Sequence, residues 1–163
     1  MAQIQVGDSV PSVTLYISGS EGPSPVDSAE FFKGRRTVLF TVPGAFTPTC
    51  SAKHVPGYLE HAGALRDAGI DQIACLSVND AFVMGAWGAD QNSGDQVVML
   101  ADGGEFTKAL GLELDLGGRA GLGVRCTRSA LVIDDGKVTG LFIEPNPGEL
   151  DVSSAENILA SLK

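Results

Sequence analysis

The strongest constraint on the fold is a short apolar run that leads directly into a proline-rich loop and a cysteine. Residues 37–42 are Thr-Val-Leu-Phe-Thr-Val, and residues 43–50 are Pro-Gly-Ala-Phe-Thr-Pro-Thr-Cys. The β-branched, apolar run predicts a buried strand. The prolines and the glycine then end the strand and predict a loop. A helix is expected to begin at Pro48 and Thr49, because proline is tolerated in a first helical turn.

The residues after this loop carry a helical pattern. Apolar side chains recur on one helical face at Val55, Tyr58, Leu59, Ala62 and Leu65. The pattern predicts a helix from about 49 to 67, bent at Pro56 and closed by Gly69. Cys50 then lies in the first turn of a helix that follows a buried strand, a placement that favours a thiolate.

Length and composition predict one soluble globular domain over residues 1–163. With 44% hydrophobic residues, the chain is long enough to bury a proper core. The net charge is −9 and the acidic residues are scattered. This argues against nucleic acid or an anionic membrane as a main partner, because both need a basic patch. No apolar run approaches the roughly 20 residues that span a bilayer.

The cysteines indicate a reducing compartment. They stand at positions 50, 75 and 126, an odd number without any C-x-x-C pair, which argues against a disulfide framework and against a zinc site. The start, Met1 to Val6, has neither a basic flank nor a long apolar core, so we expect no signal peptide. We expect a cytoplasmic protein, although the mature chain of an organellar protein could look the same.

The remaining pattern alternates strands and helices. Further strands are expected at residues 12–17, 72–78, 97–100, 129–133 and 137–143, with an Asp-Gly turn between the last two. Further helices are expected around Phe31 and Phe32, after Asp80, over residues 105–110 and at the end of the chain. Parallel βαβ units followed by a hairpin and a terminal helix predict an α/β fold of the thioredoxin-like sandwich type, a central mixed sheet flanked by helices.

Three segments allow more detailed expectations. Asn79 and Asp80 offer a cap for the helix that follows, which is expected to carry Phe82, Val83, Ala86 and Trp87 on one stripe. Ser153 to Glu156 has capping-box spacing and opens a last helix with Ile158, Leu159 and Leu162 facing inward. Residues 111–123 contain five glycines and are expected to form a flexible loop. They lack the G-x-x-x-x-G-K-[ST] pattern of a phosphate-binding loop.

A thiolate at Cys50 needs help from elsewhere in the chain. A free cysteine has a pKa of about 8.5, and lowering such a pKa to about 5.5 requires roughly 4 kcal/mol. A helix N-terminus typically supplies about 0.3 to 1 kcal/mol, and about 2 in a sheltered site. A cation or several hydrogen bonds must supply the rest. The candidates are the Arg125–Arg128 segment and the hydroxyl of Thr47, and a guanidinium also suits a substrate with an O–O bond.

His54 lies one turn after Cys50 and leaves several roles open. A Cys-His dyad for acyl transfer and a Cys-x-x-x-His metal pair are both conceivable. A metal needs further soft ligands, and His61 is the only other histidine. A histidine that hydrogen-bonds locally and shapes the pocket is favoured, so we expect no metal.

The other two cysteines each have alternative roles. Cys75 falls in the middle of an expected strand, where a cysteine usually behaves as a small core hydrophobe. Alternatively it is a resolving thiol that captures oxidised Cys50, which requires local unwinding because a disulfide tolerates only about 7 Å between Cα atoms. Cys126, next to two arginines, is considered as a reactive surface thiol.

The segment Pro43–Cys50 closely resembles the active-site signature of the peroxiredoxins, in the form of the type II class. The resemblance extends over nearly the whole chain, including Ser51–Tyr58, Ser77–Met84 and Gly111–Leu116, which are similar to plant and bacterial members. It implies a thiol peroxidase in which Cys50 is the peroxidatic cysteine. Pro43, Thr47 and Arg128 complete the catalytic set, and Gly44, Phe46, Pro48 and His54 shape the pocket.

The resemblance also implies the reaction. Cys50 attacks hydrogen peroxide or an organic hydroperoxide and becomes a sulfenic acid, which glutaredoxin with glutathione, or thioredoxin, reduces. Val152 stands where animal members have a resolving cysteine, whereas plant-like members have a second cysteine where Cys75 stands. Family members commonly form homodimers without a metal or organic cofactor and serve antioxidant defence and redox homeostasis. A peroxide-sensing regulator that acts through oxidised Cys50 is the alternative.

Overall fold

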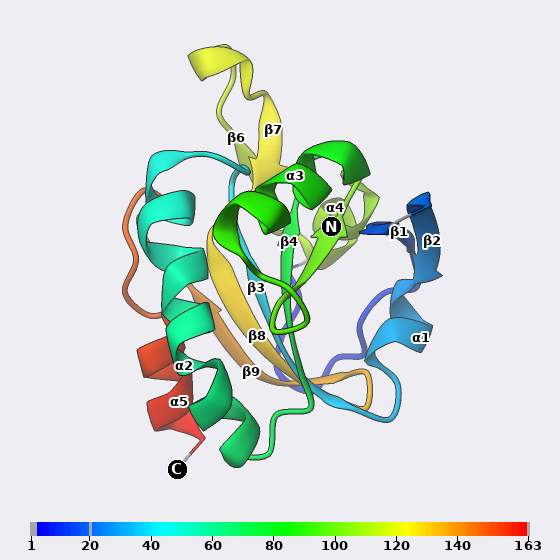
Figure 1. The fold of residues 1–163 in the computed structure, drawn as a ribbon, viewed down its shortest axis with the longest axis vertical. Helices are drawn as coiled ribbons and strands as arrows, with labels where there is room; N and C mark the ends of the chain where they lie inside the picture. The colour runs from blue at the N-terminus through cyan, green and yellow to red at the C-terminus, as the bar shows by residue number, and fades with distance from the viewer. Residues whose placement is uncertain (1–2, 20, 163) are drawn as a thin grey trace.

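A seven-stranded mixed sheet forms the centre of the molecule (Figure 1). The computed structural model describes residues 3–19 and 21–162, so Met1 and Ala2, part of the start considered above, lie outside the described residues. The strands are β1 (Thr14–Gly19), β2 (Gly22–Asp27), β3 (Arg36–Thr41), β4 (Gln72–Ser77), β5 (Val98–Ala101), β6 (Glu113–Asp115), β7 (Val124–Cys126), β8 (Ser129–Asp134) and β9 (Lys137–Ile143). The order across the main sheet is β2-β1-β5-β4-β3-β8-β9.

Helices cover both faces of this sheet. They are α1 (Ser28–Phe32), α2 (Val55–Asp67), α3 (Ala81–Gln91), α4 (Glu105–Leu110) and α5 (Ala155–Ser161), with a π turn η1 (Cys50–His54) and a 3₁₀ turn η2 (Arg119–Gly121). One half of the core packs α2, α3 and α5 against the sheet, and the other packs α1 and α4 against the opposite face. The predicted mixed sheet flanked by helices is confirmed. No helix in the described part of the chain is long and apolar enough to cross a membrane.

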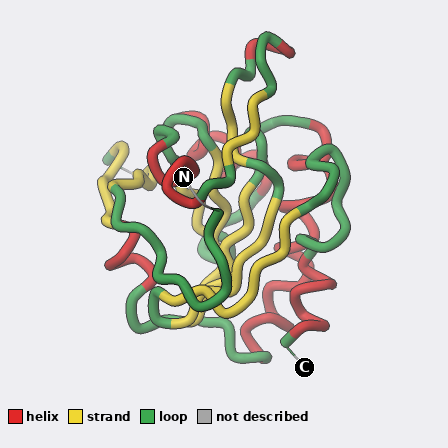
Figure 2. The backbone as a smooth tube through the Cα atoms, turned by 180° about the vertical axis from the view of Figure 1, so that it is seen from behind, coloured by secondary structure: helices red, strands yellow, loops and turns green. Residues whose placement is uncertain are grey.

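The centre of the sheet positions the functional segment. β3 pairs in parallel with β4 and antiparallel with β8, so the apolar run predicted as a buried strand is covered on both edges. The β8–β9 hairpin turns at Asp135 and Gly136, whose φ angles of 50° and 77° suit the predicted Asp-Gly turn. Figure 2 shows the strands of the main sheet from behind.

The hairpin β1–β2 extends the sheet beyond the parallel strands. The sequence predicted β1 but not its partner β2, which contains Pro23 and Pro25. β2 is the outermost strand, where a residue without an N–H group is tolerated. This edge strand was therefore missed from the sequence alone, because prolines usually indicate a loop.

Residues 111–123 were wrongly expected to form only a loop. β6 and β7 pair antiparallel as a separate two-stranded ribbon, with η2 at its tip. Figure 1 shows this ribbon projecting from the body of the molecule. Gly117, Gly121 and Gly123 have positive φ angles and occupy the tip, while the short strand segments on either side are too brief to give a clear alternating pattern.

Two predictions about helices were also wrong in detail. The buried stripe of α3 consists of Ala81, Met84, Trp87 and Gly88, and Phe82 is 71% exposed. Ala81, Trp87 and Gly88 lie three or four residues from Met84, which is the spacing of one helical face. In α5 the N-cap is Ser154, which accepts from Asn157 N, because the hydroxyl of Ser153 is bonded to Glu144 instead.

Candidate active site

The loop after β3 brings Cys50 to the start of a helix, as predicted. The N–H of Val42 donates to Leu76 O at 3.0 Å, and the buried Pro43, which has no N–H, ends the ladder. The N–H of Ser51 then donates to Thr47 O at 2.9 Å, which forms the first helical turn. The chain therefore enters a helix within a few residues of leaving the sheet.

This first turn is wider than a regular α-helical turn. η1 is a π turn in which the N–H of Val55 donates to Cys50 O, five residues back. The sequence predicted a continuous helix bent at Pro56. Because Pro56 has no N–H to continue the i→i−4 ladder, the extra residue is accommodated at this junction as a π turn. The turn that carries Cys50 therefore has a less regular pattern of backbone hydrogen bonds than the α-helix α2 that follows it.

Cys50 and Arg128 meet across 78 residues of sequence. Nη2 of Arg128 lies 3.0 Å from Cys50 Sγ and donates to it. Cys50 has no exposed surface and Arg128 is only 2% exposed. A guanidinium within hydrogen-bond distance of a buried sulfur is an arrangement that stabilises a thiolate.

The strand β3 also fixes the segment that carries Arg128. The hydroxyl of Thr41 donates to Thr127 O at 2.8 Å and lies 2.5 Å from the hydroxyl of Ser129. Arg128 is therefore held between two residues that are tied to β3. Its Nε donates to Pro147 O at 2.9 Å, which orients the guanidinium from the other side.

His54 supports Arg128 rather than Cys50. Its Nδ1 lies 2.8 Å from Arg128 Nη1, and its Nε2 lies 3.1 Å from Ser153 O. A carbonyl oxygen only accepts, so Nε2 carries the hydrogen and Nδ1 accepts from the guanidinium. Burial and the charge of Arg128 lower the pKa of His54 to about 3. Both ring nitrogens of a neutral imidazole are thus engaged, which argues against a Cys-His dyad for acyl transfer.

The remaining residues of the predicted set lie around the loop. The hydroxyl of Thr47 donates to Gly44 O at 2.7 Å, and Gly44 is buried. A Cβ atom at Gly44 would lie 3.1 Å from the Thr47 methyl group, so a glycine allows this close approach. Phe46, with a φ of 62°, is 53% exposed and faces Trp87, and Pro48 is exposed. Phe46 and Pro48 therefore lie at the rim and not beside the sulfur.

Asn79 anchors the loop and was considered in the sequence only as a helix cap. Its Oδ1 accepts from Ala45 N at 2.9 Å and from Ser77 Oγ at 2.7 Å. The backbone beside Phe46 is thereby tied to the end of β4. The position of Asn79 directly after a buried strand is the signal that could have identified it.

Arg125, the other arginine of the Arg125–Arg128 segment, has a different role. Arg125 Nη1 donates to Val78 O at 2.9 Å and its Nε to Leu122 O at 2.8 Å. It fastens the β6–β7 ribbon to the end of β4. Of the two candidate arginines, Arg128 is the one that reaches the thiol.

Cys75 and Cys126 lie on opposite faces of the sheet, both fully buried. Cys75 shares the half of the core that contains Cys50, and Cys126 belongs to the other half. Burial, and then the charge of Cys50, raise the pKa of Cys75 well above its ordinary value. Burial raises the pKa of Cys126 to about 11. Cys126 is therefore not the surface thiol that was considered.

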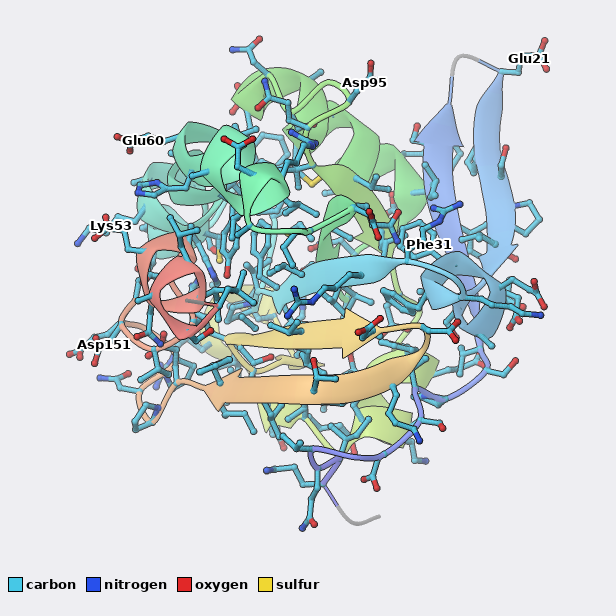
Figure 3. All side chains as sticks on the ribbon, turned by 90° about the horizontal axis from the view of Figure 1, so that it is seen from below. Glu21, Phe31, Lys53, Glu60, Asp95 and Asp151 are labelled. Atoms are coloured by element: carbon cyan, nitrogen blue, oxygen red, sulfur yellow. The ribbon has the colours of Figure 1, made fainter. Side chains whose placement is uncertain are left out.

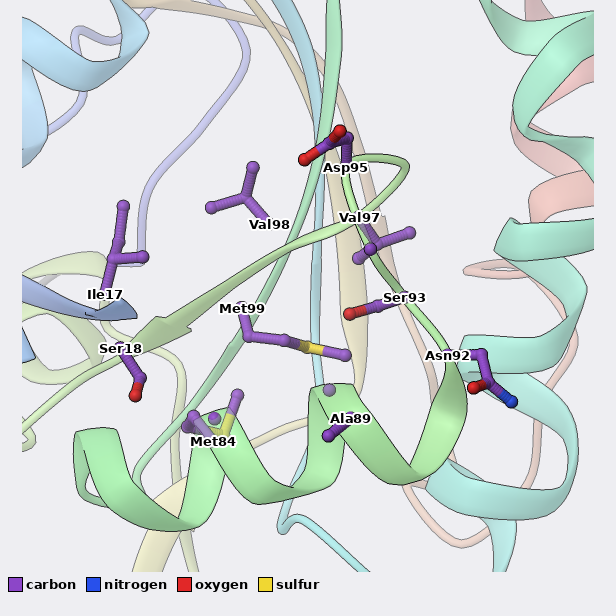
Figure 4. Close-up of a pocket in the computed structure, with 13 residues that line it drawn as sticks. Ile17, Ser18, Met84, Ala89, Asn92, Ser93, Asp95, Val97, Val98 and Met99 are labelled. Carbon is purple, nitrogen blue, oxygen red and sulfur yellow. The ribbon is translucent and has the colours of Figure 1, made fainter. Parts of the chain in front are cut away.

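A groove of about 700 Å³ lies away from the predicted site (Figure 4). It is lined by residues of β1, α3 and β5, among them Ser18, Met84 and Met99. None of the predicted site residues lines it. Across residues 3–19 and 21–162, no group of three or more His, Cys, Asp or Glu side chains is placed to hold a metal ion.

A buried cysteine at a helix start, hydrogen-bonded to a buried arginine on a thioredoxin-like sheet, defines a thiol-dependent redox protein. The sequence model of the Redoxin family matches residues 5–159. The chain is 53% identical to chloroplastic peroxiredoxin-2E of Arabidopsis thaliana over 165 residues, covering 99% of this chain and 70% of the relative. It is 49% identical to peroxiredoxin-2B of the same plant over 164 residues, covering 99% and 100%.

A solved structure agrees with these relatives. The crystal structure of reduced Prx3 in complex with H₂O₂ from Vibrio vulnificus has a TM-score of 0.93 and 49% identity, covering 99% of this chain and 100% of that one. The chain belongs to the peroxiredoxin family. It is accordingly a thiol peroxidase, an oxidoreductase that acts on a peroxide at the expense of a thiol.

Proposed function

We propose that Cys50 is the peroxidatic cysteine and that it reduces hydrogen peroxide and organic hydroperoxides. The observation that carries the proposal is the 3.0 Å hydrogen bond from Arg128 to Cys50 Sγ at the start of the helix. The thiolate attacks one peroxide oxygen, an S–O bond forms and the O–O bond breaks. The other oxygen leaves as hydroxide or alkoxide and takes up a proton, so Cys50 becomes a sulfenic acid while the peroxide is reduced.

Arg128 and Thr47 hold the peroxide in this proposal. A guanidinium has five N–H groups, and within the described residues three of the Arg128 nitrogens each donate once, to Pro147, His54 and Cys50. The two remaining N–H groups stabilise the charge that develops on the leaving oxygen. The hydroxyl of Thr47 donates to Gly44 O, so its lone pairs accept from a peroxide O–H. The buried Pro43 shields the thiolate from water.

The range of peroxides rests on two observations. The related protein from Vibrio vulnificus is described in complex with H₂O₂, which supports hydrogen peroxide as a substrate. The ring of Phe46, 53% exposed beside Trp87, gives the rim of the site an apolar surface. An alkyl group of an organic hydroperoxide can contact this surface.

An external thiol returns Cys50 to its reduced form. The sulfenic acid condenses with a thiol to form a mixed disulfide and water, and a second thiol then releases Cys50. We propose glutaredoxin with glutathione, or thioredoxin, as the source of these thiols. Cys75 is the candidate for an internal resolving thiol, and its burial in the middle of β4 means that both β4 and the π turn must open first.

We also propose an oligomeric state, a compartment and a cellular role for the enzyme. The chain acts as one domain and as a homodimer, in the cytoplasm or as the mature form in an organelle, in antioxidant defence and redox homeostasis. Similarity to two relatives named as chloroplastic supports the organellar alternative.

The test is peroxide consumption in the presence of each reductant system. Cys50→Ser is expected to lose consumption, and Cys126→Ser, which changes a thiol on the opposite face of the sheet, is expected to retain it. Unchanged consumption by Cys50→Ser would overturn the proposal. Oxidation of Cys50 by peroxide without turnover by either reductant would favour the peroxide-sensing regulator.

A further inference from the structure

Glu144 is a buried carboxylate next to the proposed site that the mechanism above does not use. It follows directly after β9 and is 4% exposed. Its Oε2 accepts from Asp151 N at 2.8 Å, Ser153 N at 2.8 Å and Ser153 Oγ at 2.6 Å. All three donors are neutral N–H and O–H groups. One oxygen atom thus closes the loop formed by residues 145–153 onto the end of β9.

This loop supplies backbone acceptors to the side chains around Cys50. Pro147 O accepts from Arg128 Nε at 2.9 Å, and Gly148 O accepts from Thr49 Oγ1 at 2.9 Å. Ser153 O accepts from His54 Nε2 at 3.1 Å and from Tyr58 OH at 2.8 Å. Three carbonyl groups of one loop therefore orient the guanidinium, the imidazole and the first helical turn.

Glu144 binds the far end of the loop at Asp151 and Ser153. The loop lies between β9 and α5 and contains no helix or strand. The carboxylate of Asp151 points away from the molecule beside α5 (Figure 3), so Asp151 contributes its N–H and not its charge. The N–H of Glu144 also donates to Arg128 O at 3.0 Å, which ties the same residue to the backbone of the arginine. The backbone N–H of Glu144 therefore binds the backbone of Arg128, while the carboxylate of Glu144 binds the loop.

We propose that Glu144 is a positioning residue for peroxide reduction, which holds Arg128 and His54 in their orientation toward Cys50 by fixing the loop 145–153. The proposal rests on the proposed function of Cys50. Glu144 contacts neither Cys50 nor the guanidinium through its side chain, so its effect passes through Pro147 O and Ser153 O. The geometry of an acceptor oxygen, rather than its charge, carries this effect.

Three variants test the proposal. Glu144→Gln keeps an acceptor oxygen of the same reach, Glu144→Ala removes it, and Glu149→Ala is the matched control, because Glu149 is an exposed glutamate of the same loop. Two properties are measured: the second-order rate of Cys50 oxidation by hydrogen peroxide, and the rate of Cys50 alkylation by iodoacetamide as a function of pH. The alkylation profile reports the thiolate without any peroxide.

Glu144→Ala is expected to slow peroxide oxidation about tenfold or more and to move the alkylation profile to higher pH, because a displaced Arg128 stabilises the thiolate less. Glu144→Gln is expected to remain within about threefold of the wild type, and Glu149→Ala to be unchanged. A merely structural role would lower the unfolding midpoint and leave the alkylation profile where it is.

A folded Glu144→Ala variant with the wild-type rate and profile would overturn the proposal, and so would a Glu144→Gln variant as impaired as Glu144→Ala. If Glu144→Ala does not fold, Ser153→Ala replaces it, since this change removes one of the three bonds and keeps Ser153 O. It should move the profile in the same direction by a smaller amount, and an unmoved profile overturns the proposal. Loss of peroxide reactivity in the wild type would instead refute the proposed function and leave the alkylation result to decide the role of Glu144.

Discussion

Arg128 donates to Nδ1 of His54 over 2.8 Å, so the bond between these residues exists only while the imidazole is neutral. The ring lies between a guanidinium on one side and Ser153 O on the other, with the rings of Phe40 and Tyr58 against it. A proton on Nδ1 would place two cations in contact within a buried space. The site is therefore built around an uncharged histidine.

This arrangement makes the stability of the protein depend on pH. The pKa of His54 is lowered to about 3 in the folded chain, against an ordinary value of 6.5. Between these values the unfolded chain binds the proton and the folded chain does not. The free energy of unfolding should therefore fall as the pH falls from about 6.5 toward 3, by up to about 1.4 kcal/mol per pH unit.

Denaturant unfolding at a series of pH values checks this expectation. His54→Asn, which cannot take up a proton, should flatten the dependence in that range, and His61→Asn on α2 should leave it in place. An equally steep dependence in His54→Asn would show that other groups cause it.

Arg128→Lys should be severely impaired although it keeps the positive charge. A lysine cannot donate at once to Pro147 O, His54 Nδ1 and Cys50 Sγ from a planar fork. We expect the rate of Cys50 oxidation to fall by about 30- to 100-fold, the equivalent of about 2 to 3 kcal/mol. Stopped-flow fluorescence of Trp87, whose Nε1 donates to Ser51 Oγ beside Cys50, measures this rate. Arg125→Lys is the comparison, and a fall of the same size there would remove the distinction between the two arginines.

Asn79 should affect the rate of Cys50 oxidation by holding the loop after β3 in place, and not by contact with the thiol. Asn79→Ala removes the acceptor for Ala45 N and Ser77 Oγ, and Asn79→Asp keeps it. We expect a fall of about tenfold in Cys50 oxidation for the alanine variant and about threefold or less for the aspartate. Asp80→Ala is the control, because loss of this α3 cap should cost about 1 kcal/mol of stability without a change in rate. Equal rates in all three variants would contradict a role for Asn79.

Formation of a Cys50–Cys75 disulfide should be slow and limited by local opening. Intact mass after one equivalent of peroxide is expected to show first a gain of about 16 Da, for the sulfenic acid. A later loss of about 2 Da relative to the reduced chain would mark the disulfide, and mild urea should hasten it. Cys75→Ser should retain the sulfenic acid. A disulfide formed as fast as the sulfenic acid itself would contradict the packing of Cys75 in β4.

The central part of the site was predictable because its signals are local. An apolar run, two prolines and the apolar stripe after Cys50 lie within one stretch of chain, and each restricts the backbone directly. The residue types alone left Arg125 and Arg128 as candidate cations beside Cys50, and the resemblance to the peroxiredoxins selected Arg128. Which of the two reaches the sulfur depends on how Thr41 binds Thr127 and Ser129, and that contact spans two strands.

The roles of the supporting residues could be predicted only in part, because the folded chain and not a local pattern sets their hydrogen-bond partners. Glu144 and Asn79 act through hydrogen bonds to backbone groups whose positions depend on the finished fold. The π turn at Cys50–His54 was missed because Pro56 indicates a bend without specifying its form. The ribbon β6–β7 was missed because its strands are three residues each, too short for a periodic signal.

The complete burial of Cys50 has a kinetic consequence. A sulfenic acid formed there has no exposed surface, and a protein reductant is far larger than a peroxide. The reductant must wait for the helical turn to open, so the frequency of opening sets a ceiling on turnover. With saturating peroxide, the rate is expected to plateau as the reductant concentration rises, at the same level for glutaredoxin and for thioredoxin.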